Sequence, residues 1–158
     1  MSSSPTDDVI VRPATTRDEA TLARLSARLA GFELPAWRTA AEIARADARG
    51  MIAAIRARHP DDCVYVAERD GVPVGCLHIL ATTDFFGRHH AHISVIATSA
   101  AAEGTGVGRA MMAFAEAWAR ERGLSLLTLH VFAANTRARR FYEQAGMMPE
   151  FLKYAKRL

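Results

Sequence analysis

The sequence of 158 residues predicts one mixed α/β domain over residues 9–158, preceded by a flexible polar tail at residues 1–8. Three kinds of pattern lead to this fold class: alternating apolar segments, apolar residues at helical spacing, and turn signals between them. In chain order they give β-α-α-β-β-β-α-β-α-β. Half of the residues are hydrophobic, which is enough for a substantial core.

The first elements are a strand and two helices. The β-branched residues Val9–Val11 predict a short strand, which Pro13 ends. Thr16–Glu19 fits a capping box, and the helix that it opens is closed by Gly31. A second apolar stripe at helical spacing runs from Trp37 to Ile55, with Trp37 expected to pack in the core. His59-Pro60 ends that helix.

A β-hairpin follows, built from Cys63–Glu68 and Val72–Leu80 around the turn Asp70-Gly71. A further strand runs from His89 or His90 to Thr98.

The register of the hairpin decides how its two cysteines lie. With Arg69 opposite Val72, Cys63 falls opposite His78 and Cys76 opposite Tyr65. The cysteines are then diagonal neighbours and neither has a CxxC partner. We therefore expect both to be reduced core residues.

The last third of the chain predicts two more helix–strand steps. Val107–Trp118 carries an apolar helical face that Gly123 ends, and Leu124–Phe132 is typical of a strand buried on both faces. A helix opens at Asn135 and closes at Gly146. Phe151–Leu158 predicts a weak terminal strand.

Charge and hydropathy argue against two classes of protein. The net charge is +3 and the pI about 9.2, but no dense basic run carries interleaved aromatic residues, so we expect no nucleic-acid partner. No apolar run reaches the ~18 residues of a membrane span, and the start lacks a signal pattern. These observations predict a cytoplasmic protein with no membrane partner.

The segment Glu103–Ala110 holds three alternating glycines directly before a predicted helix. Glycine lets backbone N–H groups approach a ligand, and a helix N-terminus offers unpaired donors. This combination predicts a pyrophosphate cradle for a nucleotide-bearing cofactor. Gly108-Arg109-Ala110 does not fit a Walker loop, and the GxGxG spacing does not fit a Rossmann fingerprint. Taken alone, the glycines are also compatible with a helix-entry turn that binds nothing.

A second motif follows the Leu124–Phe132 strand: Asn135, then Ala138, the pair Phe141-Tyr142, and Gly146-Met147. With Gly106 and Gly108, and with Val11–Thr15 and Asp18 near the start, it resembles the GNAT superfamily of acyl-CoA-dependent N-acyltransferases over nearly the whole chain. The resemblance implies a GNAT-like fold, a mixed and mostly antiparallel central sheet with flanking helices. It also implies acetyl-CoA, or another short acyl-CoA, as the acyl donor.

The resemblance also implies where that cofactor binds. Backbone N–H groups of the glycine loop would hold the pyrophosphate, and the preceding strand edge would pair with the pantetheine arm. The implied cofactor-binding residues are Ile96, Ala97, Thr98, Glu103, Gly104, Thr105, Gly106, Val107, Gly108, Arg109, Asn135 and Tyr142. Glu103 departs from the family, which usually has Gln or Arg there, and its carboxylate would repel a phosphate unless it points to solvent or Arg109 offsets it.

Two residues are candidates for proton transfer. By the resemblance, Tyr142 is the general acid that protonates the leaving thiolate, because a phenol of pKa ~10 can donate to a thiolate whose conjugate acid has a pKa of ~8.5. Without the resemblance, Tyr142 reads as a packing aromatic. No acidic residue occupies the strand before the loop, so His92 is the candidate base, directly or through water. The alternative for His92 is an exposed edge histidine.

The remaining candidates are less specific. His89, His90 and His92 could suggest a metal, but carboxylate support is scarce and we expect none. His78 and His130 are expected to be satisfied core histidines. Arg137, Arg139 and Arg140 are either phosphate contacts or a solvated helix face, and we favour the solvated face. By the resemblance, Phe32 lies in the acceptor region. The loop pair Phe85-Phe86 is a candidate for lining an acceptor cleft or for an oligomer contact.

Together these observations predict an N-acetyltransferase that moves an acetyl group to a primary amine by direct attack in a ternary complex. The acceptor is a small-molecule or peptide amine. The alternative is a CoA-binding regulatory or sensor module with little catalysis. A homodimer is common in the family, but this is an analogy alone, and the sequence leaves the oligomeric state open.

Overall fold

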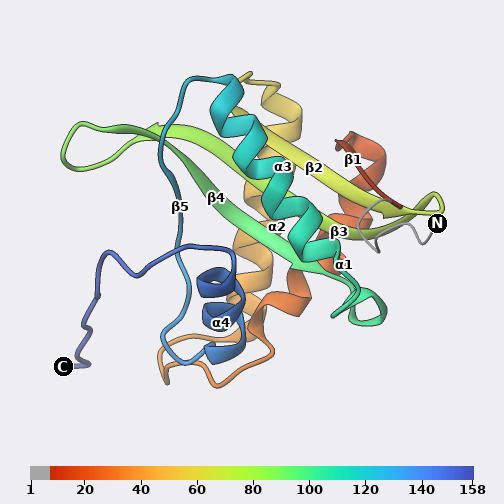
Figure 1. Ribbon diagram of the computed structural model, residues 1–158. Coiled ribbons are helices and arrows are strands. Elements are labelled where there is room, and N and C mark those ends of the chain that lie inside the picture. Colours follow the sequence, from red (N-terminus) through yellow and green to blue (C-terminus); the bar gives the residue numbers. More distant parts are fainter. Residues whose placement is uncertain (1–7) are drawn as a thin grey trace.

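A computed structural model describes residues 8–158, in which one five-stranded sheet has the order β1-β2-β3-β4-β5 (Figure 1). Neighbouring strands are antiparallel except β4 and β5, which are parallel. The predicted mostly antiparallel sheet is confirmed. The strands are β1 (Val9–Pro13), β2 (Asp62–Arg69), β3 (Val72–Thr83), β4 (His89–Thr98) and β5 (Leu127–Leu129). Apart from Asp8, the predicted tail lies outside the described residues.

Helices cover both faces of the sheet, with α3 on one face and α1 and α2 on the other (Figure 1). Leu77, Ile79 and Met111 belong to the core under α3, whereas Leu22 and Cys76 belong to the core under α1 and α2. Of the helices in residues 8–158, none is long and apolar enough to cross a membrane. The helical segments are η1 (Thr16–Asp18), α1 (Glu19–Ser26), η2 (Ala27–Ala30), α2 (Ala40–Ala57), η3 (Ala100–Ala102), α3 (Val107–Glu121) and α4 (Thr136–Gln144).

The helix starts follow capping chemistry, with two corrections to the sequence prediction. The first capping box lies one residue earlier than predicted, because Thr15 is the N-cap and Asp18 returns the hydrogen bond to its backbone. Thr39 caps α2 by accepting a hydrogen bond from the N–H of Glu42. Trp37 therefore lies before this helix, and with 45% of its surface exposed it is not the core residue that was predicted.

The hairpin of β2 and β3 forms as predicted, but its register is different. Arg69 is opposite Val72, and an irregularity at Ala67/Glu68 then shifts the pairing, so that Cys63 faces Ile79 and Cys76 faces Val66. The predicted pairs with His78 and Tyr65 were wrong because a β-bulge inserts a residue that alternation alone does not reveal. Both cysteines are free, as predicted.

A second irregularity divides β4. His78 pairs with Val95 and Ile79 pairs with Ile93, which leaves Ser94 without a partner on β3. Ala91 and Ile93 consequently belong to the core under α3, while Val95 and Ala97 belong to the core under α1 and α2. The bulge at Ser94 thus switches the face to which the buried residues of β4 point.

The C-terminal part departs most from prediction. β5 has three residues, all half-buried, instead of a strand over 124–132 buried on both faces. Phe151–Leu158 forms no strand, and all eight residues are exposed. β5 pairs with β4 only along Ala91–Ile93, so the rest of the 124–132 segment has no ladder to join there.

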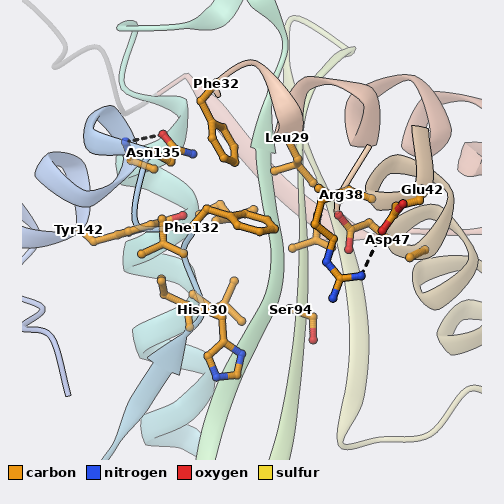
Figure 2. Close-up of a pocket in the computed structure, with 18 residues that line it drawn as sticks. Leu29, Phe32, Arg38, Glu42, Asp47, Ser94, His130, Phe132, Asn135 and Tyr142 are labelled. Carbon is orange, nitrogen blue, oxygen red and sulfur yellow. Dashed lines mark hydrogen bonds and ion pairs between the residues drawn. The ribbon is translucent and has the colours of Figure 1, made fainter. Parts of the chain in front are cut away.

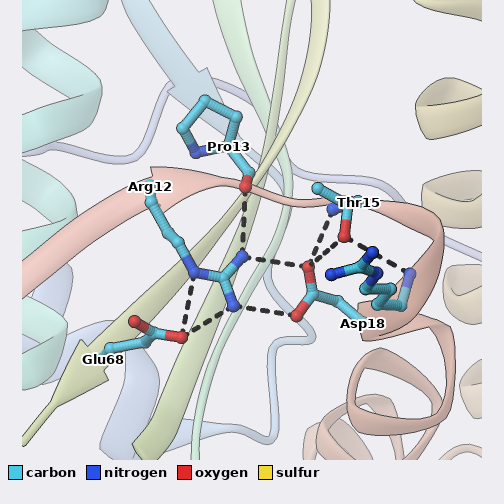
Figure 3. Close-up of polar contacts among 6 residues, drawn as sticks. Arg12, Pro13, Thr15, Asp18 and Glu68 are labelled. Atoms are coloured by element: carbon cyan, nitrogen blue, oxygen red, sulfur yellow. Dashed lines mark hydrogen bonds and ion pairs between the residues drawn. The ribbon is translucent and has the colours of Figure 1, made fainter. Parts of the chain in front are cut away.

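A half-buried charge network joins the N-terminal segment to the sheet (Figure 3). Arg12 of β1 donates two hydrogen bonds to Asp18, at 2.9 and 3.0 Å, and two to Glu68 of β2, at 2.6 and 2.9 Å. Asp18 also accepts from the backbone N–H of Thr15 at 2.8 Å. These bonds lower the pKa of Asp18 to about 2, the Arg12 hydrogen bond being the largest cause.

Candidate active site

The divergence of β4 from β5 opens a cleft in the sheet. Pairing between these strands stops at Ile93 and Leu129, so the edge of β4 from Ser94 onward no longer faces a neighbouring strand. Two adjoining cavities occupy the region, one of about 390 Å³ and one of about 1120 Å³. They meet along the residues that line both, which are Leu29, Phe32, Ile96, Asn135, Ala138 and Tyr142.

The glycine loop forms one wall of the larger cavity. Gly104 (φ 72°) and Gly106 (φ 89°) adopt the left-handed conformation that favours glycine, and Gly106 is the N-cap of α3. Within residues 8–158, the backbone N–H groups of Val107, Gly108 and Arg109 have no backbone acceptor, while that of Ala110 bonds to Gly106. These free donors at a helix N-terminus fit a pyrophosphate.

Close contacts hold this loop in place. Arg69 donates to the hydroxyl oxygen of Thr105 at 2.8 Å and to its carbonyl at 2.9 Å. A Cβ atom on Gly108 would lie 3.2 Å from Cζ of Phe141, so α3 and α4 approach each other closely here. A side chain at position 108 would therefore press on the helix that carries Tyr142.

Glu103 does not face the cavity as an isolated negative charge. Its carboxylate accepts from Arg28 of η2 at 2.6 Å and from Arg137 of α4 at 2.9 Å. These bonds lower the pKa of Glu103, with Arg137 as the largest cause. The charge is offset by Arg28 and Arg137, and not by Arg109 as the sequence suggested. Arg137 is solvent-exposed, as expected of a solvated helix face, and it also lines the larger cavity.

The structure brings the predicted cofactor-binding residues together. All of them line the larger cavity except Val107, whose side chain is fully buried in the core under α3. Asn135 caps α4 by accepting from the N–H of Ala138 at 3.1 Å, as predicted. Asn135 and Tyr142 share one side of α4, and both line both cavities.

Tyr142 lies where the two cavities meet. Burial raises the pKa of its phenol above the ordinary value, which keeps the hydroxyl protonated near neutral pH. A half-buried, protonated phenol at this junction has the form that a general acid needs.

The smaller cavity has two contrasting walls (Figure 2). Arg38, Glu42 and Asp47 lie on one side, and His130 and Phe132 lie on the other with Tyr142. Arg38 donates to Glu42 at 3.1 Å. Burial raises the pKa of Asp47, and the nearby His78 lowers it in part.

Sequence reasoning missed this polar wall. A signal was present, because Asp47 lies four residues after Ile43 and four before Met51, on the apolar stripe of α2. A carboxylate within a core-facing stripe indicates either a buried ion pair or a cavity.

The histidines are distributed differently from the predictions. His78 is buried and its Nε2 lies 2.6 Å from Asp62, as expected of a satisfied core histidine. His130 is exposed and lines the smaller cavity, so its predicted core position was wrong. Among residues 8–158 no three side chains are grouped so that they could hold a metal ion.

His92 lines neither of the two cavities. Its Nδ1 lies 2.8 Å from the hydroxyl of Thr128, and its ring centroid is 4.8 Å from that of His130. Burial is the largest cause that lowers its pKa to about 4, followed by His130 and His90. It is not the exposed edge histidine of the alternative, and its role as base stays a prediction that requires a water relay.

The aromatic candidates separate into two groups. Phe32 lines both cavities and contacts Phe132, with ring centroids 5.3 Å apart. Phe85 and Phe86, in the loop between β3 and β4, are 97% and 70% exposed and line neither cavity. Phe86 stacks on Phe151 instead, at 6.0 Å.

Several comparisons with known proteins agree with this architecture. A transcriptional regulator from Bacillus halodurans C-125 is similar in structure at 25% identity and a TM-score of 0.71, covering 95% of this chain and 99% of that one. A ribosomal-protein-alanine N-acetyltransferase from Brucella melitensis biovar Abortus 2308 has 20% identity and a TM-score of 0.68, with the same coverage. An aminoglycoside N-acetyltransferase in complex with CoA has 15% identity and a TM-score of 0.68, covering 95% of both chains.

At the level of sequence, a search of curated proteins finds no significant match. The sequence model of the Acetyltransferase (GNAT) family, however, matches residues 25–147. That range includes the glycine loop, the cleft between β4 and β5 and the helix with Tyr142. The chain therefore belongs to the GNAT family of acetyltransferases.

Proposed function

We propose that this protein is an N-acetyltransferase that transfers an acetyl group from acetyl-CoA to a primary amine by direct attack in a ternary complex. The observation that carries the proposal is the junction of the two cavities at Tyr142. The larger cavity has the anion-binding loop, and the smaller has room and polar groups for an acceptor. Two ligands bound in these cavities would meet beside one half-buried phenol.

The larger cavity is suited to CoA through several groups. The free N–H groups of Val107, Gly108 and Arg109 would donate to the pyrophosphate, and the open edge of β4 at 96–98 would pair with the pantetheine arm. Four arginines and two carboxylates line this cavity, which favours an anionic ligand. When bound, acetyl-CoA supplies the acyl group as an activated thioester.

Around the acyl end, the residues of the chain would move protons and hold charge. A backbone N–H of β4 beyond Ile93 would donate to the carbonyl oxygen as negative charge develops there. The Tyr142 hydroxyl would give its proton to the departing sulfur, whose conjugate acid has a pKa of ~8.5.

Replacing Tyr142 with Phe removes the proton that the sulfur needs and leaves the ring in place. We expect turnover to fall by about 100-fold, while the affinity for acetyl-CoA, measured by calorimetry, changes little. Tyr154→Phe is the matched control, because Tyr154 is 88% exposed and lines neither cavity. Unchanged turnover in Tyr142→Phe would exclude the acid role, and no heat on titrating wild type with acetyl-CoA would remove the proposed function itself.

A second candidate function is a CoA-binding regulatory module with little catalysis. Two observations favour it: β4 carries no carboxylate, and the similar protein from Bacillus halodurans is described as a transcriptional regulator. Binding of acetyl-CoA without acyl transfer to any amine of a broad panel would support this function over the enzyme.

A further inference from the structure

Asp47 lines the smaller cavity and takes part in none of the ion pairs among residues 8–158. Its neighbour on the same wall, Glu42, is paired with Arg38. The cavity wall therefore carries one positive charge and two negative charges, of which Asp47 is the unbalanced one. A half-buried carboxylate without a cation is costly unless a ligand compensates it.

Asp47 lies close to the bulge in β4. Gly50, one helical turn further along α2, has its Cβ position 3.9 Å from the ring of His78. His78 pairs across the sheet with Val95, the residue after Ser94. Because His78 also acts electrostatically on Asp47, the carboxylate lies over this part of β3 and β4, and Ser94 and Val95 line the same cavity.

The other titratable and charged groups near Asp47 leave it available. On β3, Nε2 of His78 is engaged by Asp62 at 2.6 Å, and the Cys76 thiol stays protonated because burial raises its pKa to about 12. The remaining groups are Arg38 and Glu42, which pair with each other, His90 and His92 on β4, and His130 and Tyr142 across the cavity. Burial raises the pKa of Asp47 above its ordinary value, which makes it a better proton acceptor than an exposed carboxylate.

We infer that Asp47 binds the ammonium group of the acceptor and takes its proton, and that the acceptor is a small primary amine with an apolar body. This inference rests on the proposed function. Apart from the polar groups named above, the cavity walls are mostly apolar, formed by Leu29, Phe32, Ile43, Val131 and Phe132. Asp47 thus takes the role that the sequence alone assigns to His92.

The proton balance of this step closes within the two cavities. One proton moves from the ammonium nitrogen to the Asp47 carboxylate, and the neutral nitrogen then attacks the thioester carbon. The C–N bond forms, the C–S bond breaks, and the sulfur takes the proton of Tyr142. The nitrogen gives a second proton to the Tyr142 oxygen, and Asp47 releases its proton to solvent.

The test compares wild type with Asp47→Asn, which keeps the shape and removes the charge, using 2-phenylethylamine as acceptor. In wild type, kcat/KM should be nearly independent of pH from about pH 6 to about pH 9, since the ammonium form binds. In Asp47→Asn only the free amine can react, so kcat/KM should be about 100-fold lower at neutral pH and rise about tenfold per pH unit. Asp61→Asn, at an exposed residue in the turn before β2, is the matched control.

A binding measurement gives a readout that does not depend on turnover. Calorimetric titration of 2-phenylethylamine into the CoA-loaded protein should show at least about tenfold weaker binding in Asp47→Asn. The uncharged analogue 2-phenylethanol should bind both proteins equally. Equal amine affinity, or parallel pH profiles for the two proteins, would overturn the role of Asp47. If kcat/KM became pH-dependent in His92→Ala but stayed independent of pH in Asp47→Asn, the role would return to His92.

Failure of this inference and failure of the proposed function look different. A wild type that binds acetyl-CoA and acetylates no amine contradicts the proposed function, while the amine titration still decides whether Asp47 binds an ammonium group. Transfer to spermidine but not to 2-phenylethylamine would overturn the apolar-bodied acceptor class alone.

Discussion

Glu103 holds two arginines at the mouth of the larger cavity. Arg28 comes from η2 and Arg137 from α4, so one carboxylate spans the cleft from one side to the other. In the proposed complex, a phosphate group of the cofactor would use the same two guanidinium groups. We therefore expect Glu103 to compete with that anionic ligand while it keeps both guanidinium groups near the site.

This competition predicts the effect of Glu103→Gln. Removal of the negative charge leaves Arg28 and Arg137 to interact with phosphate, so the affinity for CoA should rise several-fold at low salt and by less at high salt. Calorimetric titration of CoA at two salt concentrations measures both effects. Glu143→Gln, on the exposed side of α4, is the control, and weaker binding in Glu103→Gln would show that arginine placement outweighs charge repulsion.

The residues of the candidate site differ in how well the sequence predicts them. Asn135, Tyr142 and the glycines belong to short motifs, in which local spacing already carries the conformation. Arg28 and Asp47 reach the same cleft from the first third of the chain, and no local pattern records that approach. Glu103 was noticed as unusual, yet its two partners are 75 and 34 residues away and only the fold joins them.

At the scale of elements, Arg12 connects β1, η1 and β2 through Asp18 and Glu68. The Asp18 carboxylate is nearly buried, and its pKa is lowered to about 2 from a usual value of 3.8. A lowered pKa in the folded state means that the carboxylate stabilises the fold above about pH 4 and that this contribution is lost as the pH falls toward 2.

Asp18→Asn should therefore lower the free energy of unfolding by about 2 kcal/mol at neutral pH. The difference from wild type should shrink below about pH 4 and disappear only below about pH 2, where the wild-type carboxyl becomes protonated as well. Urea unfolding over this pH range measures it. Asp61→Asn provides the comparison, and a difference that persists at low pH would assign the effect to packing instead of charge.

Element boundaries were harder to predict than element types. Helices and the β2–β3 hairpin follow from periodicity and caps, whereas the bulges at Ala67/Glu68 and Ser94 depend on the pairing of whole strands. Leu124–Phe132 and Phe151–Leu158 have strand-like composition, but a strand needs a partner edge. β-propensity in these segments could not reveal that β4 turns away after Ile93.

At the scale of the whole molecule, the sheet separates two cores. Leu25 lies in the core under α1 and α2, and Ile79 lies in the core under α3. Leu25→Ala should cost about 2–5 kcal/mol and Ile79→Val about 0.5–1.5 kcal/mol in free energy of unfolding. Because the sheet lies between them, the double variant should lose the sum within about 0.5 kcal/mol.

Denaturant unfolding of the two single variants and the double variant measures this coupling. A large departure from additivity would mean that the faces respond as one unit, through shifts in the strands that they share.

The family and the overall architecture were predictable because three motifs occur in the expected order along the chain. The division of the buried residues between the two cores was not predictable, because it depends on the face of the sheet to which each half of β4 points its buried side chains.

The bulge at Ser94 has a consequence for the sequence changes that this chain can accept during evolution. Ser94 is exposed and lines the smaller cavity, so its side chain belongs to the candidate site and to neither core. For the fold itself, the residue count of β4 decides whether Ala91 and Ile93 serve one core while Val95 and Ala97 serve the other. Folding should therefore accept many substitutions at position 94 and no deletion, because the fold requires a spacer of one residue there, whatever its side chain.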